Sequence, residues 1–447
     1  DLRMSRGLGD VYKRQPIVDS FLETSYSWQI NGEDISNELT CTLPTIELGE
    51  YQVRFATHNE DGDDEVTFKV EVCSPDQVDF NWTFLQTEYN MSAGRTIRIK
   101  PVDVNNALDA VYTWTVDNEQ VQSGENDTYL FTSEQQGEHT VKVEMKNSYI
   151  LATQTLKVNV CPPAGTYQRK ISATSSASMN KVYEYLPAPG QFINENHNTT
   201  TMAEACTYAE ERINQTAYVS LGGFGGYIIV GFDHSIVNDG DYNIAITGNA
   251  FDGSSEPGIV WVMQDENGDG LPNDTWYELR GSEYGKAETW QDYAVTYHKP
   301  TGIQLPTPWT DNHGQSGSID YLGAFHRQDY YYPAWVKEKQ YTLRGTRLKE
   351  RNYDQSGNGT YWVNDSYEWG YADNFSAIDR LTDDDNYNAG PSDNHFKISH
   401  AVTFDGKDAN LKYVDFIKVQ VGVNSKSGWL GEISTEVFGI KDFNMLK

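Results

Sequence analysis

Short runs in which apolar and polar residues alternate recur along almost the whole chain. Val, Ile, Tyr and Thr form these runs, and Gly, Asn and Asp separate them. Alternation with a period of two predicts strands that bury one face. The exception is Met202–Asn214, whose Ala, Glu and Arg content predicts a short helix. The pattern therefore predicts an all-β protein with one short helix.

The N-terminal third contains an internal repeat. Residues 26–33 (YSWQINGE) match residues 112–119 (YTWTVDNE), and residues 49–59 match residues 137–147, at offsets of 86 and 88 residues. A repeat of this length, built from short alternating strands, predicts two immunoglobulin-like β-sandwiches. Each copy carries one tryptophan, Trp28 or Trp114, which we expect to lie between the two sheets of its sandwich.

These two copies resemble the PKD-like modules of bacterial surface proteins, over residues 16–161. The resemblance implies a truncated sandwich at 16–73 and a complete one at 76–161, which serve as spacers. Residues 1–15 resemble a translated sequencing adapter, so we expect them to lie outside the fold and the native N-terminus, with any signal, to be missing. The four cysteines are scattered, and we expect Cys73 and Cys161 to be buried thiols.

The repeat ends near residue 164, and residues 164–447 form a larger domain. Residues 218–281 contain four apolar runs joined by polar turns, which predict four neighbouring antiparallel strands. Residues 411–423 and 428–440 predict two closing strands. This set resembles the jelly-roll β-sandwich of galactose-binding-like and discoidin-like domains. Residues 284–399 are too long for a loop of that fold and are predicted to form an insertion.

Residues 265–274 (DENGDGLPND) form the most acidic turn of this domain. Asp265, Asn267 and Asp269 stand at alternate positions, Leu271 can offer its carbonyl oxygen, and Asp274 can complete the shell, as in the first half of a calcium loop. Hard oxygen ligands without His or Cys favour Ca²⁺ in a structural role. The alternative is an ordinary Asx-rich turn that needs no ion.

A second polar group lies on the turn between two predicted strands. Asn249, Asp252 and Glu256 occur within eight residues, NAFDGSSE. Turns of this kind supply calcium ligands in the jelly-roll domains that the sequence resembles. These three residues are therefore candidate ligands of a second ion, and an ordinary solvated turn is the alternative.

The predicted insertion is rich in aromatic residues. Flat rings stack on sugar faces or planar macrocycles at a small cost in side-chain entropy. We expect some rings to fill the core and others to line a ligand surface. The candidates are Trp309, Tyr331, Tyr332, Trp335, Trp362, Trp369 and Tyr371.

Catalytic motifs are weak by comparison. The nine histidines show no His-Glu-x-x-His spacing, and the chain has no Gly-x-Ser-x-Gly elbow. Acidic pairs such as Asp383 with Asp385, or Glu368 with Asp373, are not specific in so acidic a chain. The sequence therefore favours a protein that is not an enzyme.

The net charge of −31 disfavours binding to nucleic acid or to anionic lipid. The sequence contains no apolar run of about 18 residues, so no transmembrane segment is predicted.

The whole architecture resembles Bacteroidota cell-surface proteins, and some relatives belong to cobalamin-capture systems. The resemblance implies a non-catalytic protein on the extracellular or outer-membrane surface that captures a corrinoid or a glycan, with an outer-membrane transporter as a partner. The alternatives are a calcium-dependent glycan hydrolase or lyase, and an adhesive protein without a small ligand.

Overall fold

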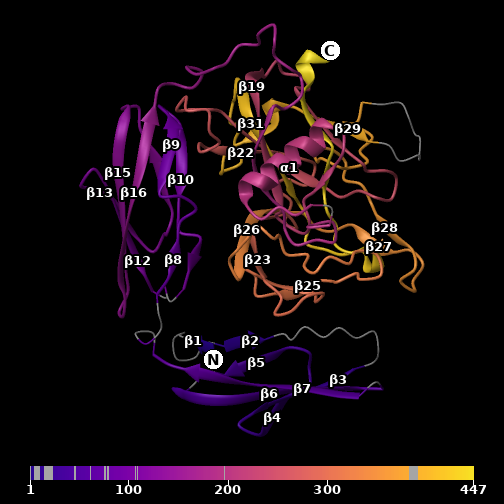
Figure 1. The fold of residues 1–447 in the computed structure, drawn as a ribbon. Helices are drawn as coiled ribbons and strands as arrows, with labels where there is room; N and C mark the ends of the chain where they lie inside the picture. Colours follow the sequence, from indigo (N-terminus) through magenta and orange to yellow (C-terminus); the bar gives the residue numbers. More distant parts are fainter. Residues whose placement is uncertain are drawn as a thin grey trace. The chain divides into compact units, whose positions relative to one another are not determined.

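A computed structural model describes residues 2–4, 11–14, 24–44, 47–60, 62–74, 77, 80–105, 107, 109–195, 197–381 and 391–447 (Figure 1). The chain divides into two compact units, Asp1–Cys161 and Pro162–Lys447. Strands dominate both units, and the described residues contain one α-helix. The predicted all-β class is confirmed.

The first sandwich of the N-terminal unit packs around Trp28. Trp28 is buried with Val53, Val70 and Phe55, and its ring centroid lies 4.6 Å from that of Phe55. Its larger sheet has the order β1 (Leu2–Met4), β7 (Gly62–Val72), β6 (Gly49–Asn59), β3 (Ser25–Ile30) and β4 (Glu33–Ser36). A smaller sheet pairs β2 (Val11–Arg14) with β5 (Cys41–Pro44).

Residues 1–15 differ from the expectation that they lie outside the fold. Leu2–Met4 pairs in parallel with β7, and Val11–Arg14 pairs with β5 in antiparallel orientation. Both neighbours offer unpaired edge groups, and any short extended segment can satisfy them. The pairing therefore uses the backbone, and the adapter origin of these residues stays a prediction.

The second sandwich repeats this plan around Trp114, which is fully buried. Its larger sheet has the order β13 (Glu119–Gly124), β12 (Val111–Val116), β15 (Gly137–Lys146), β16 (Leu151–Cys161) and β9 (Glu88–Ser92). Two strand pairs complete it, β10 (Thr96–Ile99) with β14 (Tyr129–Thr132) and β11 (Asp103–Val104) with β8 (Trp82–Thr83). Cys73 and Cys161 are both buried, as expected.

The C-terminal unit has two antiparallel layers around a main hydrophobic core, with a smaller apolar cluster beside it that contains Tyr367 and Tyr371. The larger layer has the order β17 (Lys181–Leu186), β19 (Tyr227–Val237), β31 (Tyr413–Val421), β21 (Gly258–Met263), β22 (Trp276–Leu279) and β30 (Ala401–Val402). The second layer contains β29 (Ser392–Phe396), β20 (Ile244–Gly248) and β33 (Gly439–Asp442), together with the pair β18 (Val219–Ser220) and β32 (Glu436–Val437).

The four strands expected as neighbours are present, but most of them are not adjacent. Only β21 and β22 pair with each other, whereas β19 and β20 belong to different layers. β31, which is 170 residues or more further along the chain than β19, separates β19 from β21. Apolar alternation marks a strand but does not select its partner, so this part of the prediction was wrong.

The predicted insertion is not a separate body. Four of its strands form a sheet in the order β25 (Ser316–Ile319), β24 (Thr307–Asp311), β23 (Trp290–His298) and β26 (Gln340–Arg347), and β27 (Asn352–Asp354) pairs with β28 (Trp362–Asn364). Tyr293 and Tyr297 of β23 belong to the main core. β29, inside the predicted boundary of 284–399, pairs with β20 of the main sandwich.

Helix α1 (Met202–Asn214) has the predicted bounds. Thr201 caps its first turn in a capping box with Glu204, which satisfies backbone N–H groups that have no partner inside the helix. Ala205, Ala209 and Ile213 face the core of the C-terminal unit, where α1 packs against the strands (Figure 1).

Truncation of the buried tryptophan in the second sandwich tests its role. Trp114→Ala should lower the free energy of unfolding of this domain by about 3–5 kcal/mol, because it leaves a large cavity. Urea denaturation followed by circular dichroism measures the loss. Trp114→Phe keeps most of the ring volume and should cost clearly less, and equal costs for the two variants would contradict a packing role.

Candidate functional site

The acidic turn at residues 265–274 folds around the carboxylate of Asp265. Its two oxygens accept hydrogen bonds from the backbone N–H groups of Gly268 at 2.7 Å and Gly270 at 3.0 Å. Both glycines have a φ near +75°, in the left-handed region that glycine adopts without strain. The Asp265 side chain therefore holds the turn closed.

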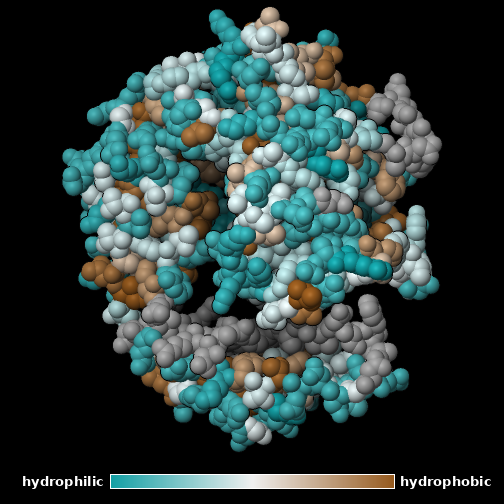
Figure 2. Space-filling model, in the orientation of Figure 1, coloured by the Kyte–Doolittle hydropathy of each residue, from teal (hydrophilic) through white to brown (hydrophobic). Residues whose placement is uncertain are grey.

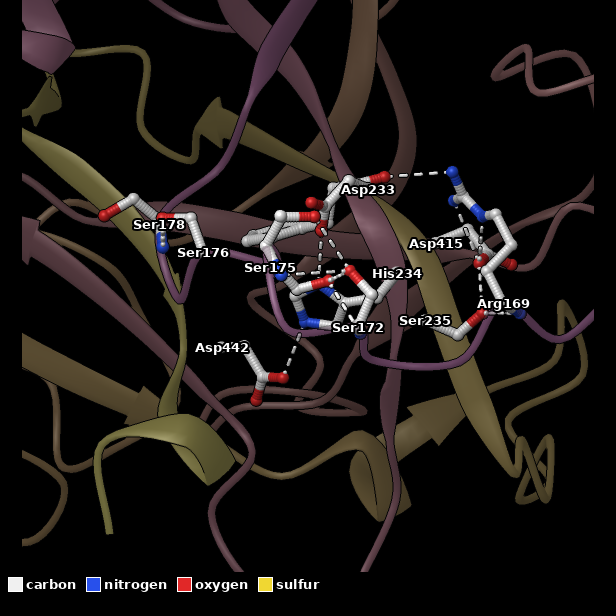
Figure 3. A network of polar contacts seen from close by, with 12 residues as sticks. Arg169, Ser172, Ser175, Ser176, Ser178, Asp233, His234, Ser235, Asp415 and Asp442 are labelled. Carbon is white, nitrogen blue, oxygen red and sulfur yellow. Dashed lines mark hydrogen bonds and ion pairs between the residues drawn. The ribbon is translucent and has the colours of Figure 1, made fainter.

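A polar network ties this turn to the core. The backbone N–H of Asp265 donates to Oδ2 of Asp415, a fully buried carboxylate, at 2.8 Å. The other oxygen of Asp415 accepts from Ser235 Oγ at 2.6 Å and from the Arg169 guanidinium at 3.0 Å (Figure 3). The charge of Asp415 is thus neutralised, and its remaining acceptor fixes the position of the turn.

Three further side chains of the turn meet above Asp265. Oδ2 of Asp269 accepts from the amide groups of Asn267 and Asn273, both at 2.8 Å, and Oδ1 of Asp269 accepts from the backbone N–H of Leu271 at 2.8 Å. The Leu271 side chain is exposed. The sequence-predicted residues Asp265, Asn267 and Asp269 thus belong to one small cluster.

Asp274 lies at the inner side of this turn, 4% exposed. Its Oδ2 accepts from the backbone N–H of Glu266 at 2.9 Å, and its Oδ1 has no hydrogen-bond partner among the described residues. Burial raises the pKa of Asp274 to about 8, and the nearby charges of Glu266 and Asp265 act in the same direction. A buried carboxylate oxygen without a donor fits a cation ligand, so the residues present fit Ca²⁺.

The second predicted group comes apart, because its members point to different places. Glu256 joins Asp373 and Glu436, and one carboxylate oxygen from each lies within 4.8 Å of the others. Asn249 contributes only its backbone N–H, which donates to Oδ1 of Asp373 at 2.8 Å. Asp252 is exposed and lies outside this cluster. The structure thus groups Glu256 with Asp373 and Glu436 and not with Asp252, and an ion held by the predicted trio stays a prediction.

The backbone holds the Asp373 carboxylate firmly. Oδ2 accepts from the backbone N–H of Glu436 at 2.9 Å, opposite the bond from Asn249. Asp373 has a φ of +52°, which is unfavourable for a non-glycine residue and is maintained only where the surroundings impose it. A Cβ atom on Gly248 would stand 2.5 Å from Oδ1 of Asp373, so the approach of these segments requires glycine there.

Burial acts on all three carboxyl groups, and repulsion by neighbouring acids acts on two of them. Burial raises the pKa of each, and the charges of neighbouring acids raise the pKa of Glu256 and Glu436 further. Glu432, four residues before Glu436, is also buried, and burial raises its pKa to about 8. Four acids are therefore gathered in this part of the C-terminal unit.

Glu432 joins two sequence segments that are more than 200 residues apart. Its Oε1 accepts from the backbone N–H of Gln191 at 2.7 Å, and the Gln191 amide donates to the carbonyl of Leu430 at 2.6 Å. A Cβ atom on Gly190 would lie 2.6 Å from the same Oε1, so glycine allows the close approach. Hydrogen bonds through Glu432 and Gln191 thus link residues 188–194 with residues 428–437.

Four of the predicted ligand-binding rings are interior. Each is almost fully buried, and its polar atom is satisfied inside the protein: the hydroxyl of Tyr331 donates to His326, that of Tyr332 donates to Glu338, the Trp335 indole donates to Tyr185, and the hydroxyl of Tyr371 accepts from Glu283. Such rings have no free face, so they belong to the core rather than to a ligand surface. Ring density in the sequence does not separate the two environments.

The other three predicted rings are partly buried. Trp309 packs against the main core, and the Trp362 indole lies against Gly428. The ring centroid of Trp369 is 5.1 Å from that of His400. These rings lie apart from one another in sequence and contact, and they do not form one platform.

Two exposed rings were missed by the sequence analysis. Phe325 is 64% exposed and Trp429 is 50% exposed, their centroids are 6.3 Å apart, and exposed Leu430 follows Trp429 in the chain. Residues 428–430 were expected to begin a strand, but they form a 3₁₀ turn bounded by Gly428 and Gly431, both at positive φ. The two glycines around Trp-Leu were the available signal for a turn.

The described residues do not bring together the acidic pair that was considered as a catalytic group. Glu368 is exposed, whereas Asp373 is buried and faces Glu256 and Glu436. Asp383 and Asp385 lie outside the described residues.

Comparison with known proteins identifies one module. A family model described as PKD-like domain matches residues 84–147, within the second sandwich. A search of curated proteins gives no match.

Several solved immunoglobulin-like structures are similar to part of the chain. The fibronectin(III)-like modules of Clostridium thermocellum CbhA are 15% identical over 38% of this chain and 94% of that chain, with a TM-score of 0.19. The amphioxus IgVJ-C2 molecule is 13% identical over 36% of this chain and 100% of that chain, with a TM-score of 0.19. At these scores the similarities carry no functional argument, and the chain is described as containing a PKD-like immunoglobulin domain.

Removal of calcium tests the acidic turn. If the turn binds Ca²⁺, EDTA should lower the melting temperature measured by differential scanning calorimetry, and Asp274→Asn should make that shift smaller, because the variant loses a charged ligand. Asp252→Asn, an exposed control outside the turn, should keep the full shift. A melting temperature that EDTA does not change would contradict calcium binding by this turn.

The pH dependence of stability tests the buried carboxyl groups. Folding raises the pKa of Glu256 and Glu436. Without calcium, in EDTA, these side chains therefore stay protonated in the folded chain at pH values where the unfolded chain has already lost its protons, from about pH 4 to 5 upward. The free energy of unfolding should therefore fall by at least about 1.4 kcal/mol between pH 5 and pH 8. Urea denaturation at both pH values measures this loss, which Glu436→Gln should reduce; a rise in stability over this range would contradict the raised values.

Proposed function

We propose that this chain is a non-catalytic cell-surface protein that binds a glycan through its C-terminal unit, with the PKD-like modules as spacers. The observation that carries the proposal is the exposed ring pair of Phe325 and Trp429, extended by Leu430. Exposed aromatic rings that lie together are unusual on a soluble surface and mark binding sites. The face shown in Figure 2 is mainly hydrophilic, with hydrophobic residues in small separate groups.

Polar side chains next to the rings can bond sugar hydroxyls. His326 Nδ1 lies 2.6 Å from Glu195 Oε1, and Lys426 Nζ lies 2.7 Å from Asp320 Oδ2. Arg327, which follows His326 in the chain, is exposed, and its Nε donates to the carbonyl of Gly323 at 3.1 Å. Apolar rings with a few charged partners suit a sugar, which has apolar faces and a rim of hydroxyl groups.

The surface location is supported by the module type. PKD-like and other immunoglobulin-like sandwiches are typical of extracellular proteins. In the described residues, no helix combines the length and apolar character that crossing a bilayer would need. The outer-membrane position, the transporter partner and a corrinoid ligand rest on the sequence resemblance and stay predictions.

Structural calcium complements this proposal. The turn at residues 265–274 displays no apolar cluster and is held by hydrogen bonds to charged groups. An ion in this turn would tie it down without any role in chemistry.

Calorimetric titration against a glycan panel and cobalamin tests the function. A sugar should release or absorb heat with the intact chain, and Trp429→Ala should weaken its affinity about tenfold or more, since a stacked ring contributes about 1.4 kcal/mol or more. Tyr149→Ala, an exposed ring in the second sandwich, is the matched control and should bind normally.

Three outcomes would count against the glycan proposal. If only cobalamin binds, the ligand is a corrinoid. If no ligand produces a heat signal, an adhesive protein without a small ligand is favoured. Turnover of a polysaccharide that stops after one acidic substitution would show an enzyme.

A further inference from the structure

Three carboxylates from distant parts of the chain meet in the C-terminal unit. Glu256 precedes β21, Asp373 follows β28, and Glu436 belongs to β32. The backbone N–H of Glu256 donates to the carbonyl of Asp373 at 2.9 Å, and that of Ser434 donates to Glu256 Oε1 at 3.3 Å. Backbone hydrogen bonds therefore hold all three segments in place, so the side chains cannot easily separate.

Their negative charges are not balanced by basic side chains. Among the described residues, none of the three forms an ion pair with Lys, Arg or His, and the charged groups that act on Glu256 and Glu436 are other acids. Three ionised carboxylates in a buried space without a counter-charge are strongly unfavourable. A cation or protons must offset this charge.

One oxygen of the cluster is left without a donor. Glu436 is 4% exposed, and its Oε1 has no hydrogen-bond partner in the described parts of the chain. Its carboxyl group lies against that of Glu256, so that acceptor faces acceptor. One shared proton can bridge Glu256 and Glu436, and that pair then keeps one negative charge. Asp373 accepts two backbone N–H groups and fits the ionised form, so two negative charges remain in the cluster.

The spacing fits a divalent cation. Ca²⁺ binds oxygen at about 2.3–2.6 Å, so two of its ligands are at most about 5 Å apart. The ligand oxygens of the cluster lie within 4.8 Å of one another. Three carboxylate donors without nitrogen or sulfur favour a hard cation such as Ca²⁺ over Zn²⁺.

We propose that Glu256, Asp373 and Glu436 form an internal calcium site, separate from the acidic turn at residues 265–274. The ion neutralises the three charges and connects the 249–256 turn, the 373–374 segment and β32. It thereby fixes the chain just after Glu432, whose carboxylate positions Gln191 beneath the Trp429 turn. The site is structural, and it does not depend on the identity of the surface ligand.

Counting bound ions tests this site. Native mass spectrometry of the intact chain, after equilibration with calcium, should show one ion more in the wild type than in Glu436→Gln. The turn variant Asp274→Asn should retain the internal ion, and the same variant with Glu436→Gln added should lose it. Asp252→Asn, an exposed neighbour of Glu256, is the matched control and should keep the wild-type count.

A second measurement uses the wild-type chain, so it tests the site even if a variant fails to fold. Crystals of the wild-type chain grown with Tb³⁺ should show anomalous density among the three carboxylates. The proposal is overturned if saturating calcium leaves no ion in Asp274→Asn, if Glu436→Gln keeps the full count, or if the Tb³⁺ density lies only at the turn. A proton-bridged pair would give these negative results together with a Glu436→Gln variant that is more stable than wild type at pH 8.

Discussion

Carboxylate groups buried away from basic partners impose the main constraint on the C-terminal unit. Burying an ionised acid is unfavourable unless hydrogen bonds, a counter-ion or a proton compensates it. The fold meets this demand in different ways at different places. Asp415 has Arg169 and Ser235, whereas Asp274 and Glu436 each retain a buried oxygen for which the described part of the chain supplies no donor. These uncompensated positions indicate where cations would act.

The polar network around β19 shows the compensated case. His234 is fully buried, with Nδ1 2.7 Å from Asp233 Oδ1 and Nε2 2.9 Å from Asp442 Oδ2 (Figure 3). Both ring nitrogens of His234 thus have a carboxylate partner. Through Asp442 this histidine connects β19 in one layer with β33 in the other, so charged groups as well as apolar side chains join the two layers.

The aromatic residues of the C-terminal unit fall into two classes, buried and exposed. Most rings of the 284–399 region extend the common core, because their sheet packs on the main sandwich and covers them. The exposed pair, Phe325 and Trp429, lies on turns and not on paired strands. A turn can present a ring to solvent without opening a gap in a sheet, so binding residues are found on loops supported by rigid strands.

The sequence alone determined what local patterns encode. Alternation predicted the strands β19, β20, β21, β22 and β31, the local composition predicted α1, and the repeat predicted two tryptophan-centred sandwiches. Each of these features depends on residues close together in the chain. The acidic turn was visible for the same reason, because Asp265 bonds to groups three and five residues away.

Only the tertiary structure decided which distant groups meet. Glu256, Asp373 and Glu436 are separated by more than 60 residues each, and no spacing rule connects them before the strands have paired. The burial of Tyr331 and Tyr371 likewise depends on which sheet covers them. Strand partners are chosen by packing over the whole core, so a sequence pattern identifies candidate side chains but not their neighbours.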